Sequence, residues 1–331
     1  MKVGIGASAD VQATVDRCKR LGVERVSINC ASLPGYRENG YPDAASLREL
    51  KGRLEDNGLE VPSATYRFAQ WPLRPYRSHS YVADACDTNS DILRSRVTNP
   101  DILLNRDRRC IDAMVRMIEI LGEVGITSVL QMNDIGKPVN VVQAEACWEG
   151  LIDIYSELTT AAEANDVGIG THSLHRLLLD GLYERAVAAG VRLEDYECFM
   201  ADGWGGPFLV GTWKELRRLV NAVPSPYNGV TLCTGMDIPG GDVPALIREF
   251  AGKIHFCQLR DHTDRWPIGR EAPLGEGQVD LPVIISALRD AGYQGILNPE
   301  HLGKPKYPYE DLEAKAVDYV KSLLEALENE Q

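Results

Sequence analysis

Short apolar runs alternate with longer amphipathic stretches along this chain. The runs have the length and composition of buried strands. We predict eight strands: Lys2–Ala7, Arg25–Ala31, Leu59–Tyr66, Thr127–Met132, Val167–His172, Gly229–Cys233, Ile254–Leu259 and Ile296–Glu300. Apolar residues at helical spacing follow each strand and predict helices near Val11–Leu21, Ala44–Asn57, Arg108–Val124, Gln143–Asn165, Leu179–Ala189, Val243–Phe250, Leu281–Ala291 and Tyr309–Leu327.

This alternation predicts an α/β fold with a parallel sheet, because each strand reaches the next through a helix. Glycines stand between five of the predicted helices and the following strands, where helices commonly end: Gly22, Gly58, Gly125, Gly252 and Gly292. Eight strand–helix units in 331 residues favour a single domain over residues 1–331, folded as a closed (β/α)8 TIM barrel. The chain carries no glycine-rich dinucleotide or phosphate-loop motif, which disfavours nucleotide-binding folds.

Two segments, residues 69–107 and 193–211, are too long for ordinary connections. The first is largely polar and interrupted by prolines, and the second contains the glycine-rich run Asp202–Pro207. Loops that follow barrel strands lie on the catalytic face. We therefore expect both segments on that face. The first would cover the site, and the second is either a flexible closure point or a plain surface loop.

Four predicted strands end in residues that can bind a metal: His172, Cys233, Gln258 and Glu300. Each residue taken singly also fits an ordinary buried or paired position, and only their coincidence at strand ends favours a metal site. A mixed set of nitrogen, sulfur and oxygen donors suits Mn, Co, Fe, Ni or Zn without choosing among them.

The alternation of side chains along Ile254–Arg260 decides which of its polar residues face the site. Gln258 and Arg260 share the face of Ile254 and should point into the barrel. His255 falls on the other face, so we expect it to point toward the helices as a hydrogen-bonded core histidine.

Further polar residues follow these strands. Asp261, His262 and His175 fit either an acid–base role or an exposed surface position. Asp280 is expected to cap the helix that it precedes.

Composition limits the possible partners. A net charge of −13 argues against a nucleic-acid-binding surface, which needs clustered Lys and Arg. No stretch approaches the roughly 20 apolar residues of a membrane span. The eight cysteines form no C-x-x-C pair, and the first residues resemble a strand rather than a signal peptide. We expect a cytoplasmic protein that binds neither nucleic acid nor membrane. A homo-oligomer remains open.

Several segments resemble the mannonate dehydratases, most strongly over residues 210–303. Val223–Gly235 resembles the cysteine-bearing segment of that family. Lys253–Phe256 with Leu259–Asp261 resembles its I-H-F-x-H-x-R-N segment, and Gly275–Leu281 resembles its G-x-V-D-M turn. Asn298–Gly303 resembles its P-D-H-G motif. The wider group is the xylose-isomerase-like barrel superfamily.

The resemblance implies a catalytic divalent metal, typically manganese. His172 and Cys233 match ligands of the family. Glu300 stands in place of a ligand aspartate, and Gln258 stands where the family has a ligand histidine. These departures indicate a divergent member of the family. The change to Gln258 bears on metal preference and affinity, because an amide oxygen is a harder, neutral donor; manganese is still the expected ion.

The resemblance also implies roles for three residues around the metal. His301 matches the adjacent catalytic histidine of the family, and Arg260 matches its substrate-contacting arginine. Tyr309 is the nearest candidate for the final tyrosine motif, with Tyr307 next.

The leading hypothesis is a metal-dependent lyase that dehydrates a sugar acid such as mannonate, or a related polyol, through a metal-stabilised enediolate. The alternative is a sugar isomerase or epimerase on the same barrel, which needs no leaving group. A nuclease of the same superfamily conflicts with the acidic composition. A non-catalytic barrel with a decayed metal site would hold no metal.

Overall fold

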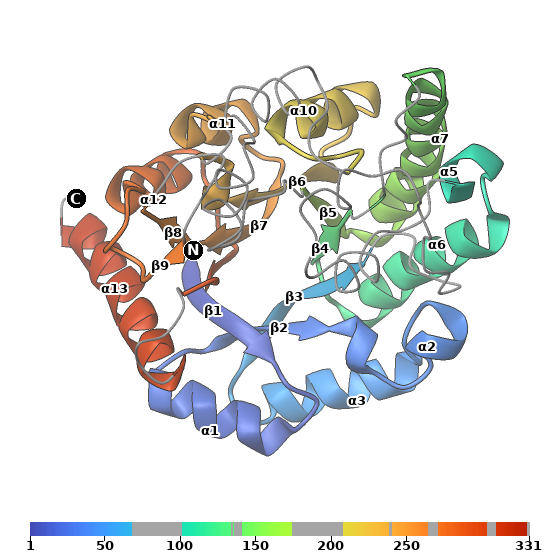
Figure 1. Ribbon diagram of the computed structural model, residues 1–331. Helices are drawn as coiled ribbons and strands as arrows, with labels where there is room; N and C mark the ends of the chain where they lie inside the picture. Colours follow the sequence, from blue (N-terminus) through green and yellow to red (C-terminus); the bar gives the residue numbers. More distant parts are fainter. Residues whose placement is uncertain are drawn as a thin grey trace, which may run out of the picture.

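The computed structural model contains a closed barrel of eight parallel strands (Figure 1). It describes residues 1–67, 101–133, 135, 141–173, 208–237, 240–263, 271–302 and 309–329. The barrel strands are β1 (Lys2–Ala7), β2 (Arg25–Asn29), β3 (Glu60–Arg67), β4 (Ser128–Met132), β5 (Gly168–His172), β6 (Asn228–Cys233), β7 (Ile254–Leu259) and β10 (Ile296–Pro299). The predicted strands and the TIM barrel are confirmed.

Helices surround the barrel as an outer ring (Figure 1). They are α1 (Val11–Leu21), α3 (Ala44–Glu55), α6 (Arg108–Val124), α7 (Val141–Asn165), α10 (Trp213–Ala222), α11 (Val243–Glu249), α12 (Leu281–Asp290) and α13 (Tyr309–Asn329). The five glycines predicted to end helices all have positive φ angles, as expected. No helix in the described ranges has the length and apolar character needed to cross a membrane.

Shorter elements decorate the connections. They are α2 (Tyr36–Asn39), α5 (Asp101–Asn105), the 3-10 helices η1 (Cys30–Ser32) and η3 (Thr234–Asp237), and the hairpin strands β8 (Asp261–His262) and β9 (Glu271–Ala272). Helix α5 lies inside the segment 69–107, where the sequence pattern predicted no helix, so the prediction is wrong for these five residues. They pack on α7, and Ile102 and Leu103 are buried.

Helix α10 was not predicted, and the helix expected over Leu179–Ala189 lies outside the described residues. Only three residues of α10 are buried: Leu216, Leu219 and Val220. The helix begins at a capping box, in which Thr212 and Glu215 bond each other's backbone. That pairing was the sequence signal for its start.

The apolar core has two layers. The main layer fills the space between barrel and helices, with residues such as Ile28, Leu121 and Val317. A small separate cluster of Leu130, Phe256 and Ile296 lies inside the barrel. The strand registers extend this inner face to Gly170, Cys233 and Gln258.

The prediction for His255 is wrong, because strand β7 carries a bulge. Val230 pairs with Ile254 and Thr231 pairs with Phe256, so His255 is an extra residue. A bulge breaks the alternation of side chains. The imidazole lies over the inner face of β5 and β6, where a Cβ at Gly168 would come within 2.1 Å of its Nδ1 atom.

His255 therefore fills the floor of the barrel. Its Nε2–H donates to the carbonyl of Pro226 at 2.9 Å. Burial lowers the pKa of His255 to about 4, so the ring is neutral near neutral pH.

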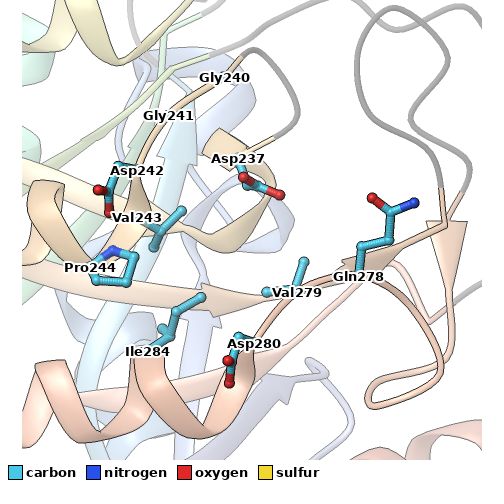
Figure 2. Close-up of a pocket in the computed structure, with 10 residues that line it drawn as sticks. All are labelled: Asp237, Gly240, Gly241, Asp242, Val243, Pro244, Gln278, Val279, Asp280 and Ile284. Carbon is cyan, nitrogen blue, oxygen red and sulfur yellow. The ribbon is translucent and has the colours of Figure 1, made fainter.

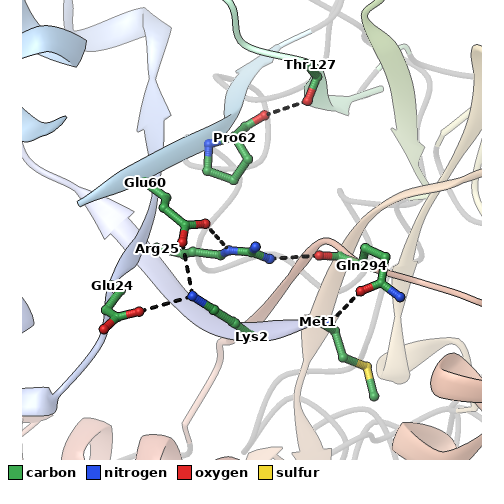
Figure 3. Close-up of polar contacts among 8 residues, drawn as sticks. All are labelled: Met1, Lys2, Glu24, Arg25, Glu60, Pro62, Thr127 and Gln294. Atoms are coloured by element: carbon green, nitrogen blue, oxygen red, sulfur yellow. Dashed lines mark hydrogen bonds and ion pairs between the residues drawn. The ribbon is translucent and has the colours of Figure 1, made fainter. Parts of the chain in front are cut away.

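Polar contacts join the first three strands to one another and to Gln294, just before β10, at the bottom of the barrel (Figure 3). Arg25 donates to Glu60 at 2.6 Å and to the carbonyl of Gln294 at 2.7 Å. Lys2 bonds both Glu24 and Glu60. These contacts lie at the amino ends of the strands, opposite the expected catalytic face.

Candidate metal centre

Three of the four predicted ligands converge at the carboxyl ends of the strands. His172 ends β5, Cys233 ends β6, and Glu300 follows β10. The backbone N–H of Glu300 donates to the carbonyl of Leu259 at 2.8 Å, which fixes it beside β7. The imidazole nitrogen, the thiol sulfur and a carboxylate oxygen all lie within 4.8 Å of one another. This spacing suits three ligands of one ion.

Gln258 lies between these residues on β7, paired in register with Cys233 on one side and Asn298 on the other. The side chain is only 9% exposed. Its Oε1 atom is buried and has no hydrogen-bond partner among the described residues. A buried acceptor without a donor is costly, and a cation would satisfy it. The donor set therefore fits a divalent ion.

The protonation of His172 suits a metal ligand. Burial lowers the pKa of His172, which favours the neutral ring. Its Nδ1 atom contacts the carbonyl of Ser173. A carbonyl only accepts, so Nδ1 carries the proton and Nε2 keeps its lone pair for another partner.

Cys233 is held as a thiol. Burial, followed by the charge of Glu300, raises the pKa of Cys233 to about 12. The Sγ atom donates to Oε1 of Glu300 at 3.5 Å. An ion bound here would displace that proton, because the thiolate is the form that binds metals.

Arg260 extends from the end of β7 at the rim of this centre. Its backbone is fixed by Thr234, whose hydroxyl accepts from the Arg260 N–H at 2.8 Å and donates to its carbonyl at 2.6 Å. A Cβ at Gly235 would come within 2.7 Å of the Arg260 side chain, so glycine leaves room for it. Its Nη2 donates to Glu271 at 3.1 Å, and its buried Nε has no partner within the described part of the chain.

His301 lies next to Glu300 with its side chain half exposed. Its φ angle of 49° is in the left-handed region, which is uncommon for a residue with a side chain. Its Nδ1 atom bonds Glu271 at 2.5 Å, and this bond raises the pKa of His301. Sequence reasoning missed Glu271. The signal for it was Arg260, a cation at the end of a buried strand that needed an anionic partner.

The remaining predicted residues lie elsewhere or outside the described ranges. Asp261 and His262 are fully buried, so neither is an exposed polar residue. Tyr309 is the first residue of α13, but its side chain is outside the described part. His175 and Tyr307 are also outside it, as is most of the segments 69–107 and 193–211.

A pocket of about 380 Å³ lies near the starts of α11 and α12, and three aspartates line it (Figure 2). Two of them cap helices. Asp242 accepts from the N–H of Ala245, and Asp280 accepts from the N–H of Val283, which confirms the predicted cap. These two carboxylates have a structural role as helix caps. The pocket does not include His172, Cys233 or Glu300.

The profile of the xylose isomerase-like TIM barrel family matches residues 15–325. The chain belongs to this family. Among curated proteins, this xylose isomerase-like barrel is 34% identical to the mannonate dehydratase of Brachyspira hyodysenteriae over 137 residues, which is 38% of each chain. It is 30% identical to that of Enterococcus faecalis over 162 residues, covering 45% of this chain and 44% of the relative. The matches thus span less than half of these relatives.

Solved structures share the whole fold. The mannonate dehydratase of Streptococcus suis serotype 2 has a TM-score of 0.66 and 18% identity, covering 98% of this barrel and 94% of its own chain. The D-psicose 3-epimerase of Clostridium cellulolyticum H10 has a TM-score of 0.60 at 16% identity, covering 98% of both chains. The zinc-bound IOLI protein has a TM-score of 0.60 at 17% identity, covering 98% of this chain and 96% of its own. At these identities the likeness concerns the fold alone.

Proposed function

We propose that this protein is a divalent-metal-dependent dehydratase of a sugar acid, mannonate or a close relative. The convergence of His172, Cys233 and Glu300 at the strand ends carries the proposal. The similarity to two mannonate dehydratases supports the reaction class. A neutral imidazole, a thiol that can ionise and a carboxylate form a donor set for a borderline divalent ion.

Four side chains would hold the ion: His172 through Nε2, Cys233 through Sγ, Glu300 through a carboxylate oxygen and Gln258 through Oε1. Manganese is the ion that we propose, with the amide oxygen of Gln258 as a hard donor. When bound, the ion supplies Lewis acidity that makes the hydrogen beside the substrate carboxylate easier to remove.

The dehydration breaks a C–H bond and a neighbouring C–OH bond, and it releases water and a 2-keto-3-deoxy acid. Arg260 would orient the substrate through its Nε–H, which is buried and has no hydrogen-bond acceptor among the described residues. His301 is half exposed at the rim, and its raised pKa favours the protonated ring. It would therefore give a proton to the departing hydroxyl. Tyr309 is proposed as the second proton-transfer group, which would take the proton from the C–H bond; the enol left after the loss of water then becomes the 2-keto-3-deoxy acid.

A panel of sugar acids and ketoses, incubated with the manganese-loaded protein, tests this function. We expect a 2-keto-3-deoxy product lighter than the substrate by one water. An isomer of unchanged mass would instead establish the isomerase or epimerase alternative.

Matched variants test the metal centre. Cys233→Ala and Glu300→Ala should lose metal and activity. Cys257→Ala removes an equally buried thiol on the other face of β7, and it should keep both. Full metal occupancy in the Cys233→Ala, Glu300→Ala double variant would overturn the proposed ligands. A wild-type protein that holds no metal would favour the non-catalytic barrel.

A further inference from the structure

A short hairpin carries one carboxylate to the rim of the metal centre. Strands β8 and β9 pair antiparallel directly after β7, with Asp261 opposite Ala272 and His262 opposite Glu271. Asp261 and His262 are fully buried. The hairpin therefore begins on a fixed base, and Glu271 is its first described residue after the loop.

Asp261 fixes the base of this hairpin. Its carboxylate accepts backbone N–H groups of four residues at 2.8–3.1 Å: His262, Gly275, Gly277 and Val279. A Cβ at Gly277 would come within 2.1 Å of the Asp261 carboxylate, so the turn closes tightly around it. Backbone N–H groups that converge on one carboxylate hold it and themselves in place. The position of Glu271 is thus set by the backbone.

Glu271 joins the two residues that we expect to contact the substrate. Its Oε1 atom accepts from Arg260 Nη2 at 3.1 Å and bonds His301 Nδ1 at 2.5 Å. Arg260 is almost completely buried, and Glu271 is 32% exposed. One carboxylate oxygen therefore sets the direction of both a guanidinium and an imidazole ring.

The backbone of His301 has an unfavourable conformation that places its ring against Glu271. A left-handed φ angle costs about 1 kcal/mol or more for a residue with a Cβ. His301 adopts such an angle, and its ring lies against Glu271. Because Nδ1 is occupied by the carboxylate, only Nε2 remains for a substrate.

We propose that Glu271 is a positioning residue of this site: it orients His301 and Arg260 together without contacting the substrate. This inference rests on the proposed function. It predicts that the loss of Glu271 acts through His301 and Arg260, and that the metal ligands on the strands are unaffected.

Kinetics of Glu271→Ala and Glu271→Gln on the active sugar acid test the inference. We expect kcat to fall by about 10- to 100-fold in the alanine variant, the usual effect of losing an orienting partner. The glutamine variant should retain more activity, because its amide oxygen can still accept. Metal content should stay at the wild-type value, since none of the proposed metal ligands is changed. Glu276→Gln, which removes an exposed carboxylate from the next turn, should behave as wild type.

A double-mutant cycle with His301→Asn separates an effect on the position of His301 from an unrelated loss of activity. In the His301→Asn background, Glu271→Ala should lower kcat by a smaller factor than in the wild type, because only Arg260 is left for Glu271 to orient. An equal loss in both backgrounds would overturn the inference, and so would full activity of Glu271→Ala.

Crystal structures of the metal-loaded wild type and Glu271→Ala provide a measurement that does not need activity. We expect the His301 ring to turn away in the variant. An unchanged ring would overturn the positioning role even in an active enzyme. A displaced ring in a protein that dehydrates no sugar acid would overturn the proposed function and leave the positioning role standing.

Discussion

Two acidic groups, the thiol of Cys233 and the carboxyl group of Glu300, lie in contact at the metal centre. The Sγ atom lies 3.5 Å from a carboxylate oxygen of Glu300 and is buried from water. Both groups cannot ionise there without a cation, because like charges this close in a buried site repel strongly. Burial, followed by the charge of Glu300, raises the pKa of Cys233 to about 12. A divalent ion would resolve it by taking the place of the thiol proton.

Metal binding should therefore release protons. Near neutral pH Cys233 is a thiol and His172 is neutral, so one proton should leave per ion. Affinity should then rise about tenfold per pH unit between pH 6 and 8, since deprotonation becomes easier as pH rises. Titration calorimetry in buffers of different ionisation enthalpy measures the released protons. The Cys257→Ala control should release the same number, whereas a pH-independent affinity in the wild type would contradict a thiolate ligand.

At the scale of the element, strand β7 shows how one extra residue changes a barrel interior. The bulge at His255 turns the ring inward, and Gly168 and Gly229 leave space for it. Above the bulge, Phe256 and Gln258 resume the regular inward positions. The predicted inward direction of Gln258 agrees with the structure because the strand is regular from Phe256 onward, whereas Ile254, which we had placed on the same face, lies below the bulge and packs in the main core layer.

This arrangement predicts a specific compensation. Gly168→Ala should lower the free energy of unfolding by about 1–3 kcal/mol, because its methyl group would collide with the His255 ring. In a His255→Ala background the same substitution should be nearly neutral. Gly6→Ala is the control, since its Cβ would meet nothing within 4 Å. Urea denaturation measures the wild type, the three single variants and the double variant. Equal losses with and without His255 would contradict an inward ring.

The elements outside the barrel strands differ in how clearly the sequence pattern predicted them. Helix α6 has nine buried residues at helical spacing, and its predicted bounds are confirmed. Helix α10 has three, and the two-residue strands β8 and β9 are too short to show any period. Their positions come from pairing with residues distant in sequence. The position of Glu271 could not be predicted for the same reason, because Glu271 lies in β9.

At the scale of the molecule, the ring of helices must close as the barrel does. Helices α1 and α13 pack side by side (Figure 1). Glu313 on α13 is almost fully buried between them. It accepts from Arg17 Nε at 3.0 Å through both carboxylate oxygens, and Arg20 lies 3.8 Å away. This ion pair joins residues almost 300 positions apart.

Removing one partner of that pair should destabilise the whole fold. Arg17→Met leaves the buried Glu313 carboxylate poorly compensated and should cost about 2–4 kcal/mol of unfolding free energy. The Arg17→Met, Glu313→Leu double variant should recover most of this, because no buried charge remains. Arg108→Met breaks exposed pairs instead and should cost less than about 1 kcal/mol. Thermal and urea unfolding measure each variant. A double variant no better than Arg17→Met alone would contradict this account.

The sequence by itself determined the barrel, since the strand–helix pattern of apolar residues is a local property repeated eight times along the chain, and five glycines mark helix ends. It also indicated His172, Cys233, Gln258 and Glu300, because polar residues that end parallel strands must meet at one face. Only the tertiary structure decided that His255 points inward and that Glu271 joins Arg260 to His301. Both depend on a bulge and a hairpin whose geometry is set by hydrogen bonds to other strands and turns, and such partners leave no periodic trace in the sequence.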